Sequence, residues 1–123
     1  MGKVISIDIG TSHIKIVEAD KQRKNIKVYK AIKVPTPEFT VDDGILRNKE
    51  LIAEVIHNAL VENKIRTKQV VFSITSSRIV TREVTIPYVA QNRVNDIINL
   101  NASEYFPFNV SDYILDYKII ETI

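Results

Sequence analysis

The sequence of 123 residues contains no cysteine, no tryptophan and only two histidines. The absence of cysteine excludes disulfide frameworks, thiolate zinc sites and cysteine nucleophiles. No apolar run approaches the ~20 residues that a membrane span needs. Lysine and arginine number 17 against 15 aspartates and glutamates, an excess too small to indicate nucleic-acid binding by itself. Because Asp8 interrupts the N-terminal apolar stretch, a secretory signal peptide is not indicated either. We therefore expect a soluble, cytoplasmic chain.

What the chain does contain is an ordinary globular composition, 45% hydrophobic and 26% charged. A chain of this length builds roughly one modest core or two thin ones. The last residue, Ile123, is apolar and ends a strand-like run, whereas the ends of natural domains are usually polar and loose. We expect the chain to be the N-terminal part of a longer protein.

Alternating apolar residues predict three strands in the first third of the chain, Lys3–Ile9, His13–Ala19 and Ile26–Val34. Tight polar turns join them, which is typical of an antiparallel meander. The first strand is almost continuously apolar and is expected to be covered on both faces of its sheet. Residues 35–46 are expected to form a connecting loop.

A helix is predicted from about residue 48 to residue 63, with Asn48 as its N-cap. Apolar residues at helical spacing form one stripe along it: Leu51, Ile52, Val55, Ile56, Ala59 and Leu60. The apolar run Gln69–Thr75 then predicts a strand parallel to the first one, because a helical crossover links them.

The second half of the chain predicts a smaller region after a polar break at Ser76 and Ser77. It contains a strand at Ile79–Ile86, a helix over 90–105 that Pro107 ends, and a strand at Tyr113–Ile123. The fold class is α/β, in an order of three strands, helix and strand, followed by strand, helix and strand. Aromatic residues gather at the second helix and last strand: Tyr105, Phe106, Phe108, Tyr113 and Tyr117.

The segment with the clearest chemistry is the first turn, which contains Asp8, Gly10, Thr11, Ser12 and Lys15. A glycine lets the backbone approach a phosphate closely, and the amides of such a turn form an anion-binding nest. The two hydroxyls and the lysine add donors and positive charge, and the carboxylate suits a magnesium ion held through water. In many hairpins, however, an aspartate at this spacing only bonds the turn backbone.

This turn, lying between the first two strands of a meander, resembles the first phosphate motif of the actin, Hsp70 and sugar-kinase superfamily. Three further segments extend the resemblance over the whole chain, to the PilM family of actin-like type IV pilus assembly proteins. These segments are Ile79–Pro87, Ala102–Phe108 and Asp116–Ile119. The division protein FtsA is a more distant resemblance. Asn101 departs from the family pattern, which usually has glutamate there.

The resemblance implies that residues 1–77 are the N-terminal part of an actin-like, RNase-H-like subdomain 1A. Residues 78–123 would be an inserted, truncated subdomain 1C of the SHS2 type. It further implies an ATP-binding scaffold with Mg as counter-ion, acting in type IV pilus assembly and twitching motility. The scaffold would be a cytoplasmic protein held at the inner membrane by its partner PilN, which it recruits by binding the N-terminal peptide of PilN. Only weak ATPase activity is expected of the full-length protein and none of this chain.

Two other functions share the first phosphate motif. An FtsA-like division protein would be distinguished by a C-terminal amphipathic helix. The N-terminal lobe of a sugar or carboxylate kinase would carry its substrate residues in later segments. The segments Tyr105–Phe108 and Asp116–Ile119 favour the pilus scaffold over the kinase, and the FtsA-like alternative stays open.

Side chains outside the motif have plainer interpretations. His13 is interpreted as a bystander of the turn, and His57 as a solvated residue off the helix stripe. A basic cluster around the second turn is attributed to protection of a sheet edge by lysines, with an anionic membrane surface or nucleic acid as the alternative: Lys21, Arg23, Lys24, Lys27, Lys30 and Lys33. Uncovered strand edges also predict self-association.

Overall fold

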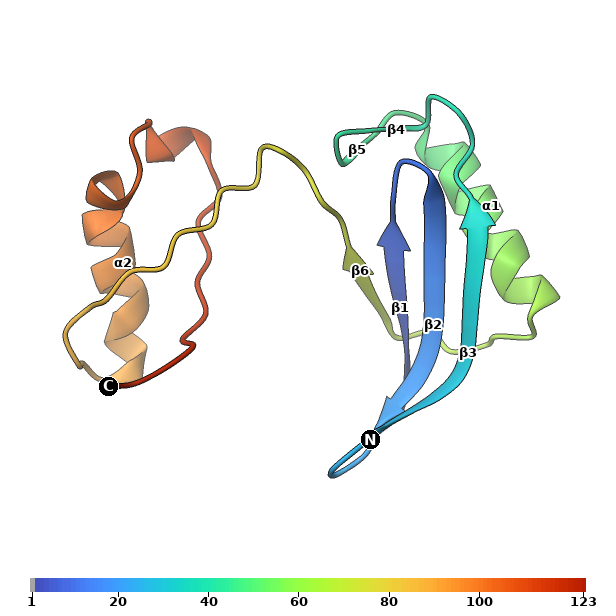
Figure 1. The fold of residues 1–123 in the computed structure, drawn as a ribbon, viewed down its shortest axis with the longest axis horizontal. Helices are drawn as coiled ribbons and strands as arrows, with labels where there is room; N and C mark the ends of the chain where they lie inside the picture. Colours follow the sequence, from blue (N-terminus) through green and yellow to red (C-terminus); the bar gives the residue numbers. More distant parts are fainter. Residues whose placement is uncertain (1) are drawn as a thin grey trace. The chain divides into compact units, whose positions relative to one another are not determined.

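The computed structural model describes residues 2–123, which divide into two compact units: unit 1, residues up to Ile79, and unit 2, Val80–Ile123. Among the described residues, unit 1 contains a four-stranded sheet, a two-stranded hairpin and helix α1. Unit 2 contains helix α2 and a short 3-10 turn (Figure 1). The mixed α/β class expected from the sequence is confirmed.

The four-stranded sheet of unit 1 has the order β3-β2-β1-β6. Strands β1 (Lys3–Ile9), β2 (His13–Lys21) and β3 (Ile26–Pro35) form the predicted antiparallel meander. Strand β6 (Val70–Ser73) pairs with β1 in parallel, as predicted, so that β3 and β6 are the two edges of the sheet.

One face of the sheet is packed against helix α1 (Lys49–Glu62), and the core of unit 1 lies between them. Strand alternation brings a row of isoleucines to that face, all almost completely buried: Ile5, Ile7, Ile14 and Ile16. Burying each such side chain stabilises the fold by about 1.5–3 kcal/mol. On the opposite face, Ser6 and Lys15 are exposed and Asp8 is half-buried. The prediction that the first strand is covered on both faces is therefore wrong for the described residues, because α1 covers only one face.

Helix α1 begins and ends as its sequence predicts. The side chain of Asn48 accepts a hydrogen bond from the amide of Leu51 at 3.1 Å, which satisfies one free donor of the first turn. Ile52 and Ala59 of the predicted stripe are buried, while His57 is exposed as expected. The helix ends at Asn63, after which Lys64 takes a left-handed conformation with φ of 56°.

The loop expected over residues 35–46 contains a small hairpin, β4 (Val41–Asp42) and β5 (Ile45–Leu46). Its turn residues Asp43 and Gly44 both have positive φ, 48° and 78°. This conformation suits a two-residue hairpin, and an Asp-Gly pair is one of its strongest sequence signals. The sequence prediction missed the hairpin because strands of two residues have no readable alternation.

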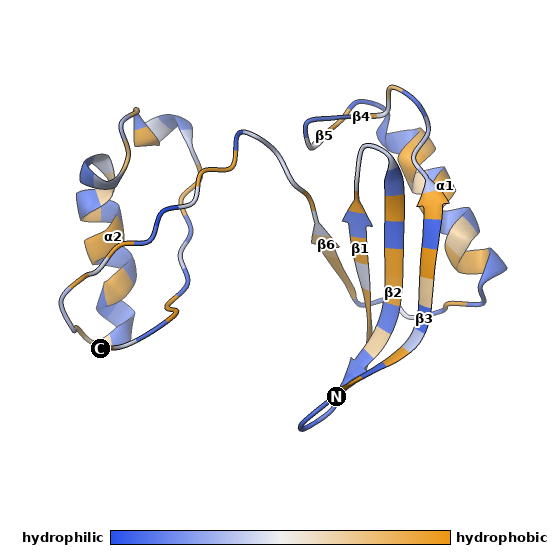
Figure 2. Cartoon of the chain, in the orientation of Figure 1, coloured by the Kyte–Doolittle hydropathy of each residue, from blue (hydrophilic) through white to orange (hydrophobic). Residues whose placement is uncertain are grey.

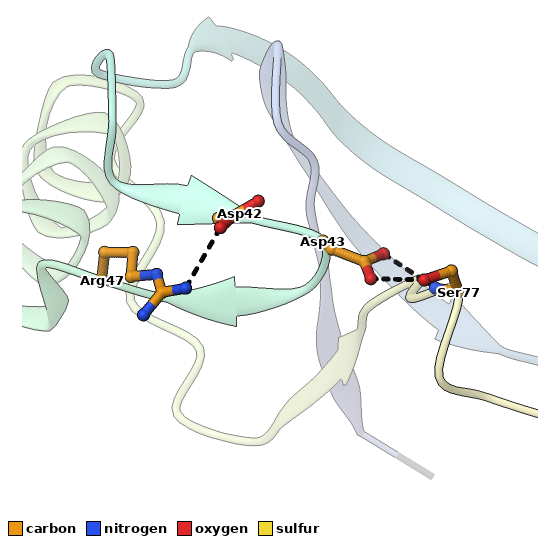
Figure 3. Close-up of polar contacts among 4 residues, drawn as sticks. All are labelled: Asp42, Asp43, Arg47 and Ser77. Atoms are coloured by element: carbon orange, nitrogen blue, oxygen red, sulfur yellow. Dashed lines mark hydrogen bonds and ion pairs between the residues drawn. The ribbon is translucent and has the colours of Figure 1, made fainter.

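Asp43 also holds the segment that follows β6 (Figure 3). Its carboxylate accepts hydrogen bonds from the amide of Ser77 at 2.7 Å and from the Ser77 hydroxyl at 2.5 Å. These two bonds, with a smaller contribution from Arg78, hold the pKa of Asp43 below its ordinary value of 3.8. The last residues of unit 1 are thereby fastened to the β4–β5 hairpin.

In unit 2, helix α2 (Gln91–Tyr105) agrees with the prediction, and Phe106 leaves the helix in an extended conformation just before Pro107. The strands expected at 79–86 and 113–123 are absent, because no backbone hydrogen bond joins these two segments within residues 2–123. An extended segment is a strand only when a neighbour pairs with it. Three aromatic rings pack in succession near the helix end: Phe106 stacks on Phe108, and Tyr113 lies tilted against Phe108. Neither α1 nor α2, the α-helices of the described part, has the length and apolarity of a membrane span.

Candidate functional site

The residues of the predicted phosphate motif lie at the carboxyl end of β1 and the start of β2. Asp8 is the direct cross-strand partner of Lys15, so that both side chains belong to the face of the sheet opposite α1. In the parallel pairing with β6, Asp8 stands opposite Ser73. A carboxylate, an ammonium group and a hydroxyl therefore come from three adjacent strands at one end of the sheet.

The turn between β1 and β2 is tightly closed at Gly10. The Gly10 amide donates to the carbonyl oxygen of His13 at 3.0 Å. A Cβ atom at Gly10 would lie 2.8 Å from that same oxygen, closer than real Cβ contacts occur. Glycine is therefore required here by the turn itself, whether or not a phosphate binds.

Thr36, which follows β3, fastens the turn from one side. Its hydroxyl donates to the Gly10 carbonyl at 2.7 Å, and its amide donates to the Ser12 carbonyl at 2.9 Å. In a trans peptide the carbonyl and the following amide point in opposite directions. The Thr11 amide must therefore point away from Thr36.

The clamp by Thr36 occupies the carbonyls of Gly10 and Ser12 and leaves two amide donors of the turn free. Among residues 2–123, the amides of Thr11 and Ser12 have no hydrogen-bond acceptor, and both residues are exposed. The Ser12 hydroxyl is hydrogen bonded to Nδ1 of His13 at 2.8 Å, which links His13 to the motif. Successive free amides of this kind form a concave nest for an anion.

This geometry fits an anion such as a phosphate group. The two free amides and the exposed Lys15 would hold phosphate oxygens, and Asp8 is positioned to bind a magnesium ion through water. The described residues contain no group of three His, Cys, Asp or Glu side chains that could hold a metal ion directly. The motif is therefore a candidate for one wall of a phosphate site.

All five predicted site residues, Asp8 to Lys15, are brought together by the hairpin, as their spacing implies. The sequence analysis missed Thr36 and Ser73. Aligning the two parallel strands would have found Ser73, because it occupies the position on β6 that Asp8 occupies on β1. No local signal identifies Thr36, which lies 26 residues from Gly10 in the sequence.

Comparisons with known proteins agree with this architecture. Residues 6–123 match the family described as type IV pilus assembly protein PilM. No curated protein matches the sequence. A solved structure titled PilM-PilN type IV pilus biogenesis complex is similar in fold, with a TM-score of 0.72 and 23% sequence identity. The similarity covers 88% of this chain and 32% of the solved chain, so this chain spans about a third of that one.

Proposed function

This chain belongs to the PilM family of type IV pilus assembly proteins, and from that premise we propose that it is the nucleotide-binding, partner-recruiting part of an actin-like scaffold. In this proposal residues 1–77 are the start of subdomain 1A and residues 78–123 belong to subdomain 1C. The scaffold binds ATP with Mg at the Asp8–Lys15 turn, which we call the phosphate turn. It works at the cytoplasmic side of the inner membrane, where it recruits a PilN-type protein.

The observation that supports nucleotide binding most directly is the clamped turn. Thr36 occupies the carbonyls of Gly10 and Ser12, while the amides of Thr11 and Ser12 remain available. The arrangement binds and orients phosphate, and bound ATP would supply the phosphoryl chemistry. Because hydrolysis needs an attacking water held in line, and these residues form a single open wall, no turnover is expected from this chain.

Mg-ATP titration followed by amide NMR tests the nucleotide site. A ligand enclosed on one side keeps much of its hydration, so we expect affinity of about 1 mM or weaker, about −4 kcal/mol. The largest shifts should fall on Thr11 and Ser12. Asp8→Asn and Lys15→Ala should each weaken binding.

Lys33→Ala is the matched control for Lys15→Ala, because Lys33 is the cross-strand neighbour of Lys15 on β3 and is equally exposed. It should leave the Thr11 and Ser12 shifts unchanged. Sub-micromolar affinity, or equal loss with Lys33→Ala, would contradict a one-walled site at this turn.

Partner recruitment is supported by a different feature, the unpaired backbone of unit 2. Residues 80–86 make no backbone hydrogen bonds within the described chain and carry exposed apolar side chains, among them Val80 and Val84. Extended peptides bind such segments by adding a strand, with backbone bonds for affinity and alternate side chains for specificity. The solved relative is titled as a complex of PilM with PilN.

A synthetic peptide with the N-terminal sequence of a PilN-type protein tests recruitment. Added to the labelled chain, it should shift amides over residues 79–88 and 102–117 and leave the phosphate turn unaffected. Because the peptide and Mg-ATP are followed at different amides, failure of one part of the proposal leaves the other measurable. No shift in unit 2 at millimolar peptide would contradict recruitment by these segments.

A further inference from the structure

A hollow of about 580 Å³ opens where β1 begins, at the end of the sheet opposite the phosphate turn. The seven residues of β1 separate the two places by roughly 20 Å, at about 3.3 Å per residue. Four cations line the hollow, together with Glu18, Tyr29 and Thr67: Lys3, Lys30, Lys64 and Arg66.

The hollow holds one acidic residue, Glu18, against these four cations, and Glu18 is the cross-strand partner of Lys30. Glu18 is only 5% exposed, and its carboxylate accepts a hydrogen bond from the Thr67 hydroxyl at 2.7 Å. The ion pair found in residues 2–123 is Arg47–Asp42, at another part of unit 1. Because cations outnumber the single carboxylate in its lining, the hollow keeps a net positive charge, which suits an anion.

More positive charge continues along the hairpin between β2 and β3. Three cations lie at its turn: Lys21, Arg23 and Lys24. In the strand register, Asp20 stands opposite Lys27 of β3 and Lys3 of β1. Figure 1 shows this hairpin beside the start of β1, so the hairpin and the hollow form one basic end of unit 1. Asp20, the cross-strand partner of both Lys3 and Lys27, is an acid among these cations outside the hollow.

Exposed apolar and aromatic side chains lie at the same end of the sheet as these cations. The register places Ile26 and Val28 on the face opposite the one that carries Lys3 and Lys27. The start of β3 contains apolar segments, orange in Figure 2, between polar ones. Here Ile26 is 67% exposed and Val28 is 56% exposed. Tyr29 lies under the ammonium groups of Lys3 and Lys27, at 4.3 and 5.1 Å from its ring centre. Cations mixed with exposed apolar and tyrosine side chains are typical of surfaces that enter the polar layer of a membrane.

Protection of a sheet edge explains only part of this cluster. Lys27, Lys30 and Lys33 do lie on the edge strand β3, where lysines discourage strand addition. Lys3, however, begins an internal strand, and Lys64 and Arg66 lie in the connection after α1. These three cations protect no edge, yet they line the same hollow.

We propose that the basic end of unit 1 docks on the anionic surface of a lipid bilayer. Phospholipid headgroup phosphates occupy the hollow beside Lys3, Lys64 and Arg66, while Ile26 and Val28 enter the interface. Nucleic acid would use the same cations but would gain nothing from the exposed apolar pair. The excess of cations together with an exposed apolar pair at the same end of the sheet therefore favours the bilayer.

Co-sedimentation of the 123-residue chain with lipid vesicles tests the proposal. Binding should be strong on vesicles containing phosphatidylglycerol, weak on pure phosphatidylcholine, and should fall as salt rises. Lys64→Gln and Arg66→Gln should each lower the partition coefficient about fivefold, the expected effect of one cation near such a surface. Ile26→Ser should also lower it, without changing retention on a short DNA duplex.

Lys49→Gln and Lys118→Gln are the matched controls, since both remove one exposed cation elsewhere on the chain. They should leave vesicle binding within twofold, and circular dichroism should confirm that every variant is folded. Equal losses with control and test variants would overturn the proposal. So would binding that is indifferent to lipid charge, or DNA binding that exceeds vesicle binding and ignores Ile26→Ser.

Discussion

Gly10 illustrates how one residue serves both the fold and the candidate site. A side chain at this position would meet the His13 carbonyl at 2.8 Å, and relieving that contact must open the turn. We predict that Gly10→Ala destabilises the chain by about 1–3 kcal/mol, the usual cost of overpacking. It should also weaken Mg-ATP binding, because the amides that follow would move.

Urea unfolding measures the stability change, and Gly2→Ala is its control, since nothing lies within 4 Å of a Cβ placed there. That control should match the unchanged chain in midpoint and slope. A Gly10→Ala variant of undiminished stability would mean that the turn relaxes without cost.

Asp43 makes a prediction about pH. Hydrogen bonds from Ser77 hold the pKa of Asp43 below its ordinary value of 3.8. A carboxyl whose pKa is lower in the folded chain contributes stability that is present above the unfolded pKa and is lost as pH falls through the folded pKa. We therefore expect the hydrogen bonds between Asp43 and Ser77 to persist above pH 3.8 and to be lost only at lower pH.

The amide shift of Ser77, followed by NMR during acid titration, should move with a midpoint under 3.8. Asp43→Asn should abolish this transition. Asp42→Asn, which alters the neighbouring exposed pair with Arg47, should preserve it. A midpoint at or above the ordinary value would contradict the contact.

At the scale of elements, the two edges of the sheet differ. Edge strand β3 carries Lys27, Lys30 and Lys33, whereas edge strand β6 carries no charge and exposes Val71 and Phe72 by 57% and 59%. An uncharged, apolar edge is a template for strand addition. We predict that the chain self-associates through β6.

Sedimentation over roughly a hundredfold range of concentration measures this association. Val71→Lys should shift the equilibrium strongly towards monomer. The control Val28→Lys adds a lysine to β3, an edge that lysines already protect, and should change little. A chain that is monomeric throughout would contradict an open β6 edge.

At the scale of the whole molecule, the two units differ in how much core they contain. The isoleucine core of unit 1 joins three elements, whereas the buried apolar side chains of unit 2 are Val94 and Ala102. Stability within a protein varies with such burial and with backbone pairing. We predict slow amide exchange in β1 and β2, intermediate exchange in α2, and rapid exchange over 80–86 and 114–123.

Hydrogen exchange read by NMR resolves these classes residue by residue. Addition of a partner peptide along residues 79–88 should slow exchange there and leave β1 unchanged, which serves as the internal control. Strong protection of residues 80–86 in the free chain would mean that the strand predicted from the sequence does form in solution.

The sequence alone determined what depends on neighbours along the chain. The isoleucines of β1 and β2 alternate with polar residues, so strand and face followed from period two. Asn48 and the stripe from Ile52 to Ala59 likewise marked helix α1, because capping and helical spacing are local. The closeness of the five residues from Asp8 to Lys15 was also readable, since a single hairpin holds them together.

Only the tertiary structure decided what depends on segments far apart in sequence. Whether 79–86 becomes a strand depends on a pairing partner, which its alternation cannot supply. Thr36 clamps the phosphate turn from 26 residues away, and Arg66 joins Lys3 at one hollow across most of unit 1. The physical reason is the same in each case: hydrogen bonds and electrostatic fields act through space, and the fold sets which distant residues become neighbours.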